Sequence, residues 1–532
     1  MKTRSRAGLL SLLILTATSI ACGGDGGGGG GGGTVVVGMR TDFGGFNPIT
    51  NSDQYTDEII KYALFTPLVQ YDENLGVRPW LAESWQEEGD TAVVFRLRND
   101  VKWHDGQPVT ADDVKFTFDL AKDSSAASPL VGAIFLAEVE SATVVDPQTI
   151  RFDYARPHAQ ALEDFWWAPV PRHRLQDVAP TELRNADYNR NPVGSGPYRF
   201  VEWQANQRLV LEPNPDFPEA LGGPGAARRV VFRIVPEPAT LLTELMTGGV
   251  HVDIPLEPDQ IADIEGNDQF RVHAFPGRTV YYIGWNNQRE PFRSPEVRRA
   301  MTLAIDRQEI IDALLSGYGD PAVSPVPPYS PVFPDGFEPL PHDQAQARQL
   351  LQAAGWSDSN GDQILDRNGQ PFRFTLMTSD RPLNRAVAEA VQAQLREVGV
   401  DAQIRILEFQ TLLAQHKARD FDAVFANWVL DNFQMAAAPS ALFHSRFATQ
   451  PQTANRSAVA DPELDRLIDA IGGAADQAAA QQNWRAFHER LQQVQPFTFM
   501  FWLQETAASS ASANGVEMDQ RGELASIAEW SL

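Results

Sequence analysis

A strand–helix–strand pattern in the second half of the chain constrains the fold more strongly than any other feature. Apolar residues alternate along 372–376 and 402–406, and residues 387–398 between them repeat at helical spacing. Gly399 stands directly after this helical stretch, where glycine commonly ends a helix. Residues 421–428 form a further apolar run after another short helix. Strands and helices repeated in this order predict a parallel or mixed sheet covered by helices.

The remaining folded part of the 532 residues also has a mixed α and β pattern, in two regions that meet near residue 280. Ser294 followed by Pro295 marks one helix start, and Asp306 with Glu309 has the spacing of a capping box at another. Further strands are predicted at 34–39, 92–97, 144–145, 149–152 and 496–502, and a helical stretch at 461–494. The last of these strands lies near the C-terminus, so it could return to the first region.

The first 22 residues have the organisation of an export signal. Three basic residues precede the apolar run 8–15, which is too short to span a membrane. The residues that end at Cys22 resemble a bacterial lipobox, in which the cysteine is acylated, with Ser19 where leucine is usual. We therefore predict a lipoprotein signal peptide at 1–22 with Cys22 as the lipidation site. The alternative is an ordinary cleavable signal that happens to contain a cysteine.

Residues 23–33 include eight consecutive glycines, a composition that favours a flexible tether. A tether is useful when one end is fixed, and acylation of Cys22 would supply that anchor. The sequence thus predicts a protein held by lipid in the periplasm or on the cell surface.

The charge balance excludes one class of partner. The chain has 69 Asp and Glu against 44 Lys and Arg, a formal net charge of −25. A protein that binds nucleic acid neutralises phosphates with Lys and Arg, so this balance argues against such binding. The single cysteine excludes a disulfide within one chain. The sequence carries no motif for a cofactor, and we predict none.

Many short segments, in order along the chain, resemble one bacterial family. The matching segments are 46–48, 65–69, 79–85, 101–114, 194–198, 214–216, 285–286, 297–300, 304–307, 461–465 and 495–497. The stretch 101–114 (VKWHDGQPVTADDV) is the most distinctive of them. The family is that of the peptide/nickel-type extracellular solute-binding proteins of ABC transporters, which includes the oligopeptide- and dipeptide-binding proteins. The matches cover nearly all of the chain after the tether.

The resemblance implies an α/β fold, the two-lobed clamshell of the large peptide-binding type of periplasmic binding protein. Lobe one would span 34–280, with an extra subdomain at about 76–189, and lobe two 281–500. Residues 501–532 would return to lobe one. The resemblance also implies a monomer that binds a peptide or peptide-like solute and delivers it to an ABC permease in the cytoplasmic membrane.

Four residues are candidates for contact with the solute. Asp431 matches the family aspartate that pairs with the α-ammonium of a peptide, and Trp428 stands three residues before it. Both follow a predicted strand, at the edge of the sheet where open α/β folds bind ligands. Asp53 and Tyr55 are weaker candidates carried over from lobe one. The alternative for Asp431 is a loop aspartate that caps the next helix, and Trp428 could belong to the core.

Other polar motifs fit structural roles better than chemical ones. His104 lies in a predicted turn, and 194–197 lacks the spacing of a nucleophile elbow. The nine histidines show no zinc-ligand spacing. The weak calcium candidates are Asp358, Asn360, Asp362 and Asp366, but this loop lacks the glycine and glutamate of a complete site, so a solvated turn fits better.

The sequence therefore predicts a binding protein with no catalysis of its own. The first alternative is the same fold with a non-peptide solute such as a metal chelate, an opine or a sugar. A secreted hydrolase would need a nucleophile and base or paired carboxylates, and no such motif is present. A tethered chaperone or sensor partner would use the same cleft without a permease.

Overall fold

The computed structural model describes residues 32–89, 91–131, 135–155, 161–430, 433, 435, 437–450, 453–472 and 477–532. Within this part, Gly32–Leu532 forms one compact unit. The predicted signal peptide, the lipidation site Cys22 and most of the predicted tether lie outside the described residues. Gly32 and Gly33, predicted as the end of the tether, belong instead to the first strand, β1 (Gly32–Met39).

One mixed sheet of eleven strands runs through both lobes, in the order β17-β16-β18-β12-β19-β11-β1-β10-β9-β8, with β13 paired to β19. Its lobe-one strands are β1, β8 (Tyr198–Gln204), β9 (Arg208–Pro213), β10 (Ala227–Ile234) and β11 (Val252–Ile254). The helices of this lobe are α1 (Gln54–Glu58), which continues into a π-helical turn (Ile59–Leu64), α3 (Arg172–Leu175) and α4 (Pro238–Thr247). Gly38, in β1, leaves room for the Leu241 side chain of α4.

The extra subdomain has a separate antiparallel sheet. Its strands, in spatial order, are β4 (Ala82–Glu87), β5 (Ala92–Leu97), β7 (Thr149–Tyr154) and β6 (Val139–Asp146). Helix α2 (Ala111–Lys122) begins at the capping box formed by Thr110 and Asp113. A short hairpin of β2 (Val69–Tyr71) and β3 (Val77–Pro79) leads into the subdomain. The predicted strand at 92–97 and the hairpin at 144–152 are confirmed.

Lobe two contains the predicted strand–helix–strand unit as β16 (Arg373–Ser379), α8 (Pro382–Glu397) and β17 (Asp401–Leu407). Strands β17 and β18 (Ala423–Val429) both pair with β16 in parallel, which confirms the predicted parallel arrangement. The other elements of the lobe are α5 (Pro295–Ala304), α6 (Arg307–Leu314), β13 (Gly319–Pro321), α7 (Gln344–Ala353), β14 (Asp366–Arg367), β15 (Gln370–Pro371), α9 (Phe409–Lys417), α10 (Ala437–Phe443), α11 (Pro462–Gly472) and α12 (Gln477–Val494).

The two predicted helix caps of lobe two are present, but the capping box predicted for Asp306 and Glu309 is only half formed, because the Asp306 backbone N–H donates to Gln394 at 2.9 Å. The Ser294 side chain accepts a hydrogen bond from the Val297 backbone at 3.2 Å, and that of Asp306 accepts one from Glu309 at 3.0 Å. These contacts satisfy backbone N–H groups that have no partner within the first turn of a helix.

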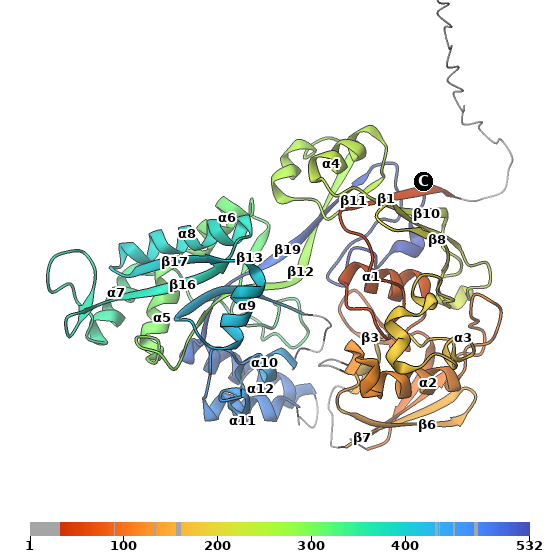
Figure 1. Ribbon diagram of the computed structural model, residues 1–532, viewed down its shortest axis with the longest axis horizontal. Helices are drawn as coiled ribbons and strands as arrows, with labels where there is room; N and C mark the ends of the chain where they lie inside the picture. Colours follow the sequence, from red (N-terminus) through yellow and green to blue (C-terminus); the bar gives the residue numbers. More distant parts are fainter. Residues whose placement is uncertain are drawn as a thin grey trace, which may run out of the picture. The chain divides into compact units, whose positions relative to one another are not determined.

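Two long strands cross between the lobes, as Figure 1 shows. They are β12 (Phe270–Trp285) and β19 (Phe497–Ser510), which pair antiparallel with a register shift between Pro276 and Thr279. The chain beyond β19 packs on lobe one, where Ala226 donates a backbone hydrogen bond to Ala528 at 2.8 Å. The crossing strands therefore connect the two lobes, and β19 leads into the C-terminal segment on lobe one.

Candidate interlobe binding site

A cavity of about 410 Å³ has walls from both lobes. Its lining residues are Pro48, Asn51, Ser52, Asp53, Gln54, Asp57, Lys61, Pro129, Leu130, Phe135, Arg278, Val429 and Leu430. Seven of them come from 48–61, in and before α1 and its π-helical turn, and three come from 129–135. Arg278 comes from β12, Val429 ends β18, and Leu430 directly follows it. A molecule in this cavity would touch both lobes and a strand that crosses between them.

The first helix supplies the polar wall of the cavity. Asp53 caps the helix, because its Oδ1 accepts hydrogen bonds from the backbone N and the hydroxyl of Thr56 at 2.8 and 2.6 Å. One helical turn apart, Asp57 and Lys61 form an ion pair at 2.6 Å. The Lys61 ammonium lies 3.7 Å from the centroid of the Trp166 ring, and its burial lowers the pKa of this amine.

Arg278 supplies a second cation. Its Nη2 lies 2.7 Å from Oε1 of Glu58, and both side chains are buried. Its guanidinium also lies 5.9 Å from the centroid of the Phe433 ring. Lys61 and Arg278 therefore bring two positive charges to the cavity wall, each next to a carboxylate.

Lobe two contributes the end of β18. Val429 is exposed at the cavity, and the backbone N–H of Leu430 donates to the Arg278 carbonyl at 2.9 Å. Close by along the chain, the ring of Phe433 contacts Tyr71 and Trp166 of lobe one, with centroids 5.0 and 5.4 Å apart. This aromatic cluster joins the lobes beside the cavity.

The four predicted contact residues differ in their positions relative to the cavity. Asp53 lines the cavity, whereas Tyr55 does not and lies near the carboxylates of Glu58 and Glu523. Trp428 of β18 is half-buried against the apolar core, directly before the lining residues Val429 and Leu430. Asp431 lies outside the described residues. Its role remains a prediction, as do the proposed contacts of the other three with a solute.

Sequence reasoning missed Lys61 and Arg278. Each had a signal, because a cation stands inside an otherwise apolar segment: Lys61 in IIKYAL and Arg278 in the strand FPGRTVYY. A charged residue in such a segment is buried only when it pairs with an opposite charge, so each of these cations predicts a carboxylate nearby.

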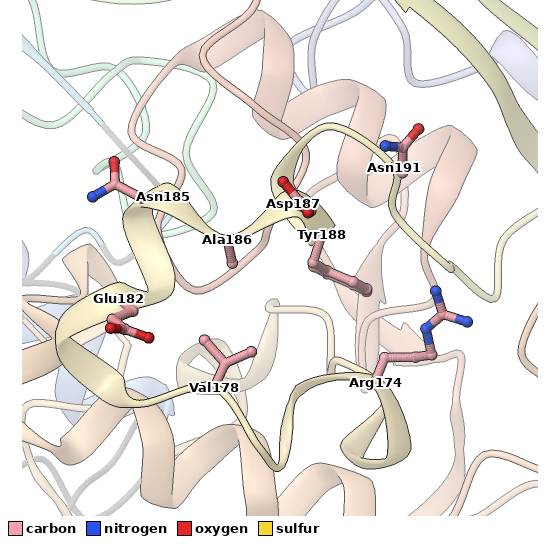
Figure 2. Close-up of a pocket in the computed structure, with 8 residues that line it drawn as sticks. All are labelled: Arg174, Val178, Glu182, Asn185, Ala186, Asp187, Tyr188 and Asn191. Carbon is pink, nitrogen blue, oxygen red and sulfur yellow. The ribbon is translucent and has the colours of Figure 1, made fainter.

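Figure 2 shows a second hollow, which at about 610 Å³ is larger than the interlobe cavity. It is lined by Arg174, Val178, Glu182, Asn185, Ala186, Asp187, Tyr188 and Asn191. All of these residues come from one segment of lobe one, 174–191. Movement of one lobe against the other would not change this hollow, so we do not take it as the site.

The other polar motifs have structural contacts. His104 accepts a hydrogen bond from the Gly194 backbone at 3.2 Å, and burial lowers its pKa to about 4. In the calcium-like loop, Asp358 accepts backbone hydrogen bonds from Gly361 and Gln363, and Asp366 accepts one from Ser359. Among the described residues, no group of three or more His, Cys, Asp or Glu could hold a metal ion.

Comparison with known families gives a match over most of the chain. The family model described as "Bacterial extracellular solute-binding proteins, family 5 Middle" matches residues 76–450. The oligopeptide-binding protein AppA of Bacillus subtilis is 28% identical over 508 residues, which cover 94% of this chain and 91% of that protein. The nickel-binding periplasmic protein of Escherichia coli is 26% identical over 491 residues, 89% of each chain.

Solved structures agree with this result. AppA of Bacillus subtilis, solved in complex with a nonapeptide, has a TM-score of 0.73 at 28% identity over 94% of this chain and 99% of that one. CtaP of Listeria monocytogenes, an ABC transporter substrate-binding protein, has a TM-score of 0.82 at 24% identity with the same coverage. These likenesses confirm the predicted two-lobed α/β fold. In the part of the chain that the structure describes, no helix has the length and apolar character needed to cross a membrane.

Proposed function

Because this chain belongs to the bacterial extracellular solute-binding proteins of family 5, we propose that it captures peptides or a peptide-like solute for an ABC importer. The family assignment agrees with the resemblance found in the sequence. The relatives named above are binding proteins, and the proposal includes no catalytic step.

The observation that carries this proposal is the cavity with walls from both lobes and from Arg278 on a crossing strand. A solute there gains contacts from both lobes only when the lobes are closed. Binding then shifts the protein toward the closed state, by as much as the solute prefers that state over the open one. The permease would recognise the closed form.

The charges around the cavity suit a dipolar solute such as a peptide. Lys61 and Arg278 could pair with an anionic group, and Asp53 and Asp57 with an ammonium group. The family resemblance assigns the α-ammonium to Asp431, and we retain that assignment as part of the proposal. An extended peptide would add hydrogen bonds between its backbone and the protein, which give affinity with little side-chain preference.

The proposal also includes the predicted location and division of the chain. Cys22 would carry the lipid outside the cytoplasm, the glycine-rich segment would act as the tether, and the lobes would divide near residues 280 and 500. Mass spectrometry of the protein purified from membranes tests the anchor. A mature N-terminus at an acylated Cys22 supports the proposal, and an intact first residue in the cytosol contradicts it.

Native mass spectrometry of the purified protein tests the solute. Two probes are added in turn: a pool of alanine peptides two to nine residues long, and nickel with histidine. We expect peptides to remain bound. If only the nickel chelate is retained, the proposed solute is a metal chelate instead of a peptide, in keeping with the nickel-binding relative. Binding of neither probe would contradict both forms of the proposal.

A further inference from the structure

Four charged groups meet behind the cavity, where both crossing strands reach lobe one; three of them are buried and the fourth, Glu505, is half-buried. They are Glu58 of the first helix, Arg278 of β12, Glu505 of β19 and Glu523 of the C-terminal segment. Glu58 also accepts a hydrogen bond from the backbone N–H of Leu524 at 3.1 Å, and Glu505 accepts one from the backbone of Arg278. We call the three carboxylates the acid cluster.

The acid cluster has more negative charge than its surroundings neutralise. The exposed fractions of Glu58, Arg278 and Glu523 are 1%, 5% and 0%. Neither carboxylate oxygen of Glu523 meets a hydrogen-bonding partner in another described residue. A buried carboxylate without a cation is costly, and one arginine cannot neutralise three. These surroundings therefore favour the protonated forms of the three carboxyl groups more than water does.

The pKa values of all three carboxyl groups are raised. Burial raises the pKa of Glu58 to about 7, that of Glu505 above its usual value and that of Glu523 well above it. Mutual repulsion adds to all but the Glu505 shift, while Arg278 opposes all three. The other charged or titratable groups that interact with these residues are Tyr55, Asp57, Lys61, Tyr62, Tyr281 and Tyr329. One step further out, Arg40 acts on Tyr55, and Asp519 and Arg521 act on Tyr62.

Arg278 is the group that the acid cluster shares with the cavity. From this geometry we infer that Arg278 binds an anionic group of the solute, and that the acid cluster takes up protons as it does so. An anion at Arg278 competes with Glu58 for the same positive charge and adds a negative charge nearby. Both effects favour the protonated carboxyl groups, and a neutral Glu58 leaves the guanidinium to the solute. Affinity for the anion therefore rises as pH falls through the range in which the cluster titrates.

This inference rests on the proposed function, and the experiment separates the two. The probe is the alanine-peptide pool, used with free carboxyl termini and again with amidated ones. Isothermal titration calorimetry is run at about pH 6 and about pH 8 in two cationic buffers that differ in ionisation enthalpy. The α-ammonium group, with a usual pKa of about 7.7–8.0, titrates in both pools, so the acids are compared with the amides. We expect the affinity of the acids relative to the amides to be about tenfold higher at the lower pH, and the acids to take up more protons than the amides.

Glu58→Gln should remove the difference between acids and amides in pH dependence and in proton uptake. Glu83→Gln is the matched control, because Glu83 is an exposed carboxylate of the extra subdomain, paired with Arg96 at 2.8 Å. If Glu58→Gln does not fold, Glu523→Gln serves in its place. The same pH dependence and the same proton uptake for acids and amides would overturn the inference while leaving the proposed function intact.

If neither pool binds, the peptide proposal fails. The inference about Arg278 and the acid cluster is then tested by a measurement that does not need the natural solute. The unfolding temperature of the wild type is compared in sodium succinate and in sodium chloride of equal ionic strength. Stabilisation by succinate that is greater at the lower pH, and lost in Glu58→Gln, supports an anion site linked to the acid cluster. No difference between the two salts would overturn it.

Discussion

The guanidinium Nη2 of Arg278 lies 2.7 Å from Oε1 of Glu58, which ties a strand that crosses between the lobes to the first helix of lobe one. The Arg278 side chain is 6% exposed and that of Glu58 1%, so water screens this pair very little. The same arginine lines the interlobe cavity. In the proposed function, the stability of the junction and the binding of solute therefore depend on one side chain.

Replacing Arg278 with methionine should destabilise the protein strongly. Arg278→Met removes the cation and leaves Glu58 and Glu523 buried beside the half-buried Glu505, for which we expect a loss of about 3–5 kcal/mol in the free energy of unfolding. Urea denaturation measures this loss. Arg96→Met is the control, because Arg96 pairs with Glu83 on the surface and such pairs contribute about 0–1 kcal/mol. Equal losses in the two variants would contradict the prediction.

The acid cluster should also make the folded state less stable as pH rises. The folded pKa of Glu58 is about 7, above its value of 4.5 in an unfolded chain, so the folded state binds more protons between these pH values. The stabilising contribution is present below about pH 4.5 and is lost as pH rises through about 7. Glu523, whose pKa is also raised, acts in the same direction.

Glu523→Gln tests this dependence because glutamine cannot ionise. We expect the variant to match the wild type near pH 5 and to exceed its free energy of unfolding by about 2 kcal/mol near pH 8. The difference between the two proteins is the quantity to measure, because buried histidines such as His416, with a pKa lowered to about 3, have the opposite effect in acid. A constant difference from pH 5 to pH 8 would rule out titration of Glu523.

Much of the fold could be predicted from local patterns. The unit formed by β16, α8 and β17 follows from periodicity, because strands and helices bury side chains at different spacings. The caps Ser294 and Asp306 follow from the hydrogen bonds that a helix start needs. These features depend on residues close together in the sequence.

The candidate site was harder to predict because its parts are far apart in the sequence. Glu58 and Arg278 are separated by 220 residues, and Glu58 and Leu524 by 466. No local pattern indicates that a C-terminal segment will bring Glu523 to the first helix. Asp53 was predicted from the family resemblance, and its helix cap shows that one side chain can have a structural contact and still line a cavity.

The close approach of two loops predicts a strict requirement for glycine at position 194. A Cβ atom at Gly194 would lie 1.9 Å from the Leu64 carbonyl oxygen, so Gly194→Ala forces the two backbones apart. We expect the free energy of unfolding to fall by about 2 kcal/mol or more. Gly44→Ala is the control, because Gly44 has no positive φ and a Cβ there would meet open space. Thermal and urea denaturation of both variants would show the contrast, and equal stability would contradict it.

Filling the cavity from lobe two should block the solute without unfolding the protein. Val429 is 38% exposed at the end of β18, so the larger side chain of Val429→Trp can extend into the cavity with little strain. We expect peptide affinity to fall at least about tenfold, or 1.4 kcal/mol, and the free energy of unfolding to change by less than about 0.5 kcal/mol. Calorimetric titration with the alanine-peptide pool measures the first change and urea denaturation the second.

Val145→Trp is the matched control for this prediction. Val145 is 61% exposed on β6 of the extra subdomain and does not line the cavity, so its replacement should leave peptide affinity unchanged. If Val429→Trp binds peptides as tightly as the wild type, the solute does not occupy the interlobe cavity. The hollow in the extra subdomain (Figure 2) would then be the next site to test, with a substitution at Ala186 on its wall. If only Val429→Trp loses affinity, the solute contacts the end of β18. A solute bound between the two lobes would make that contact.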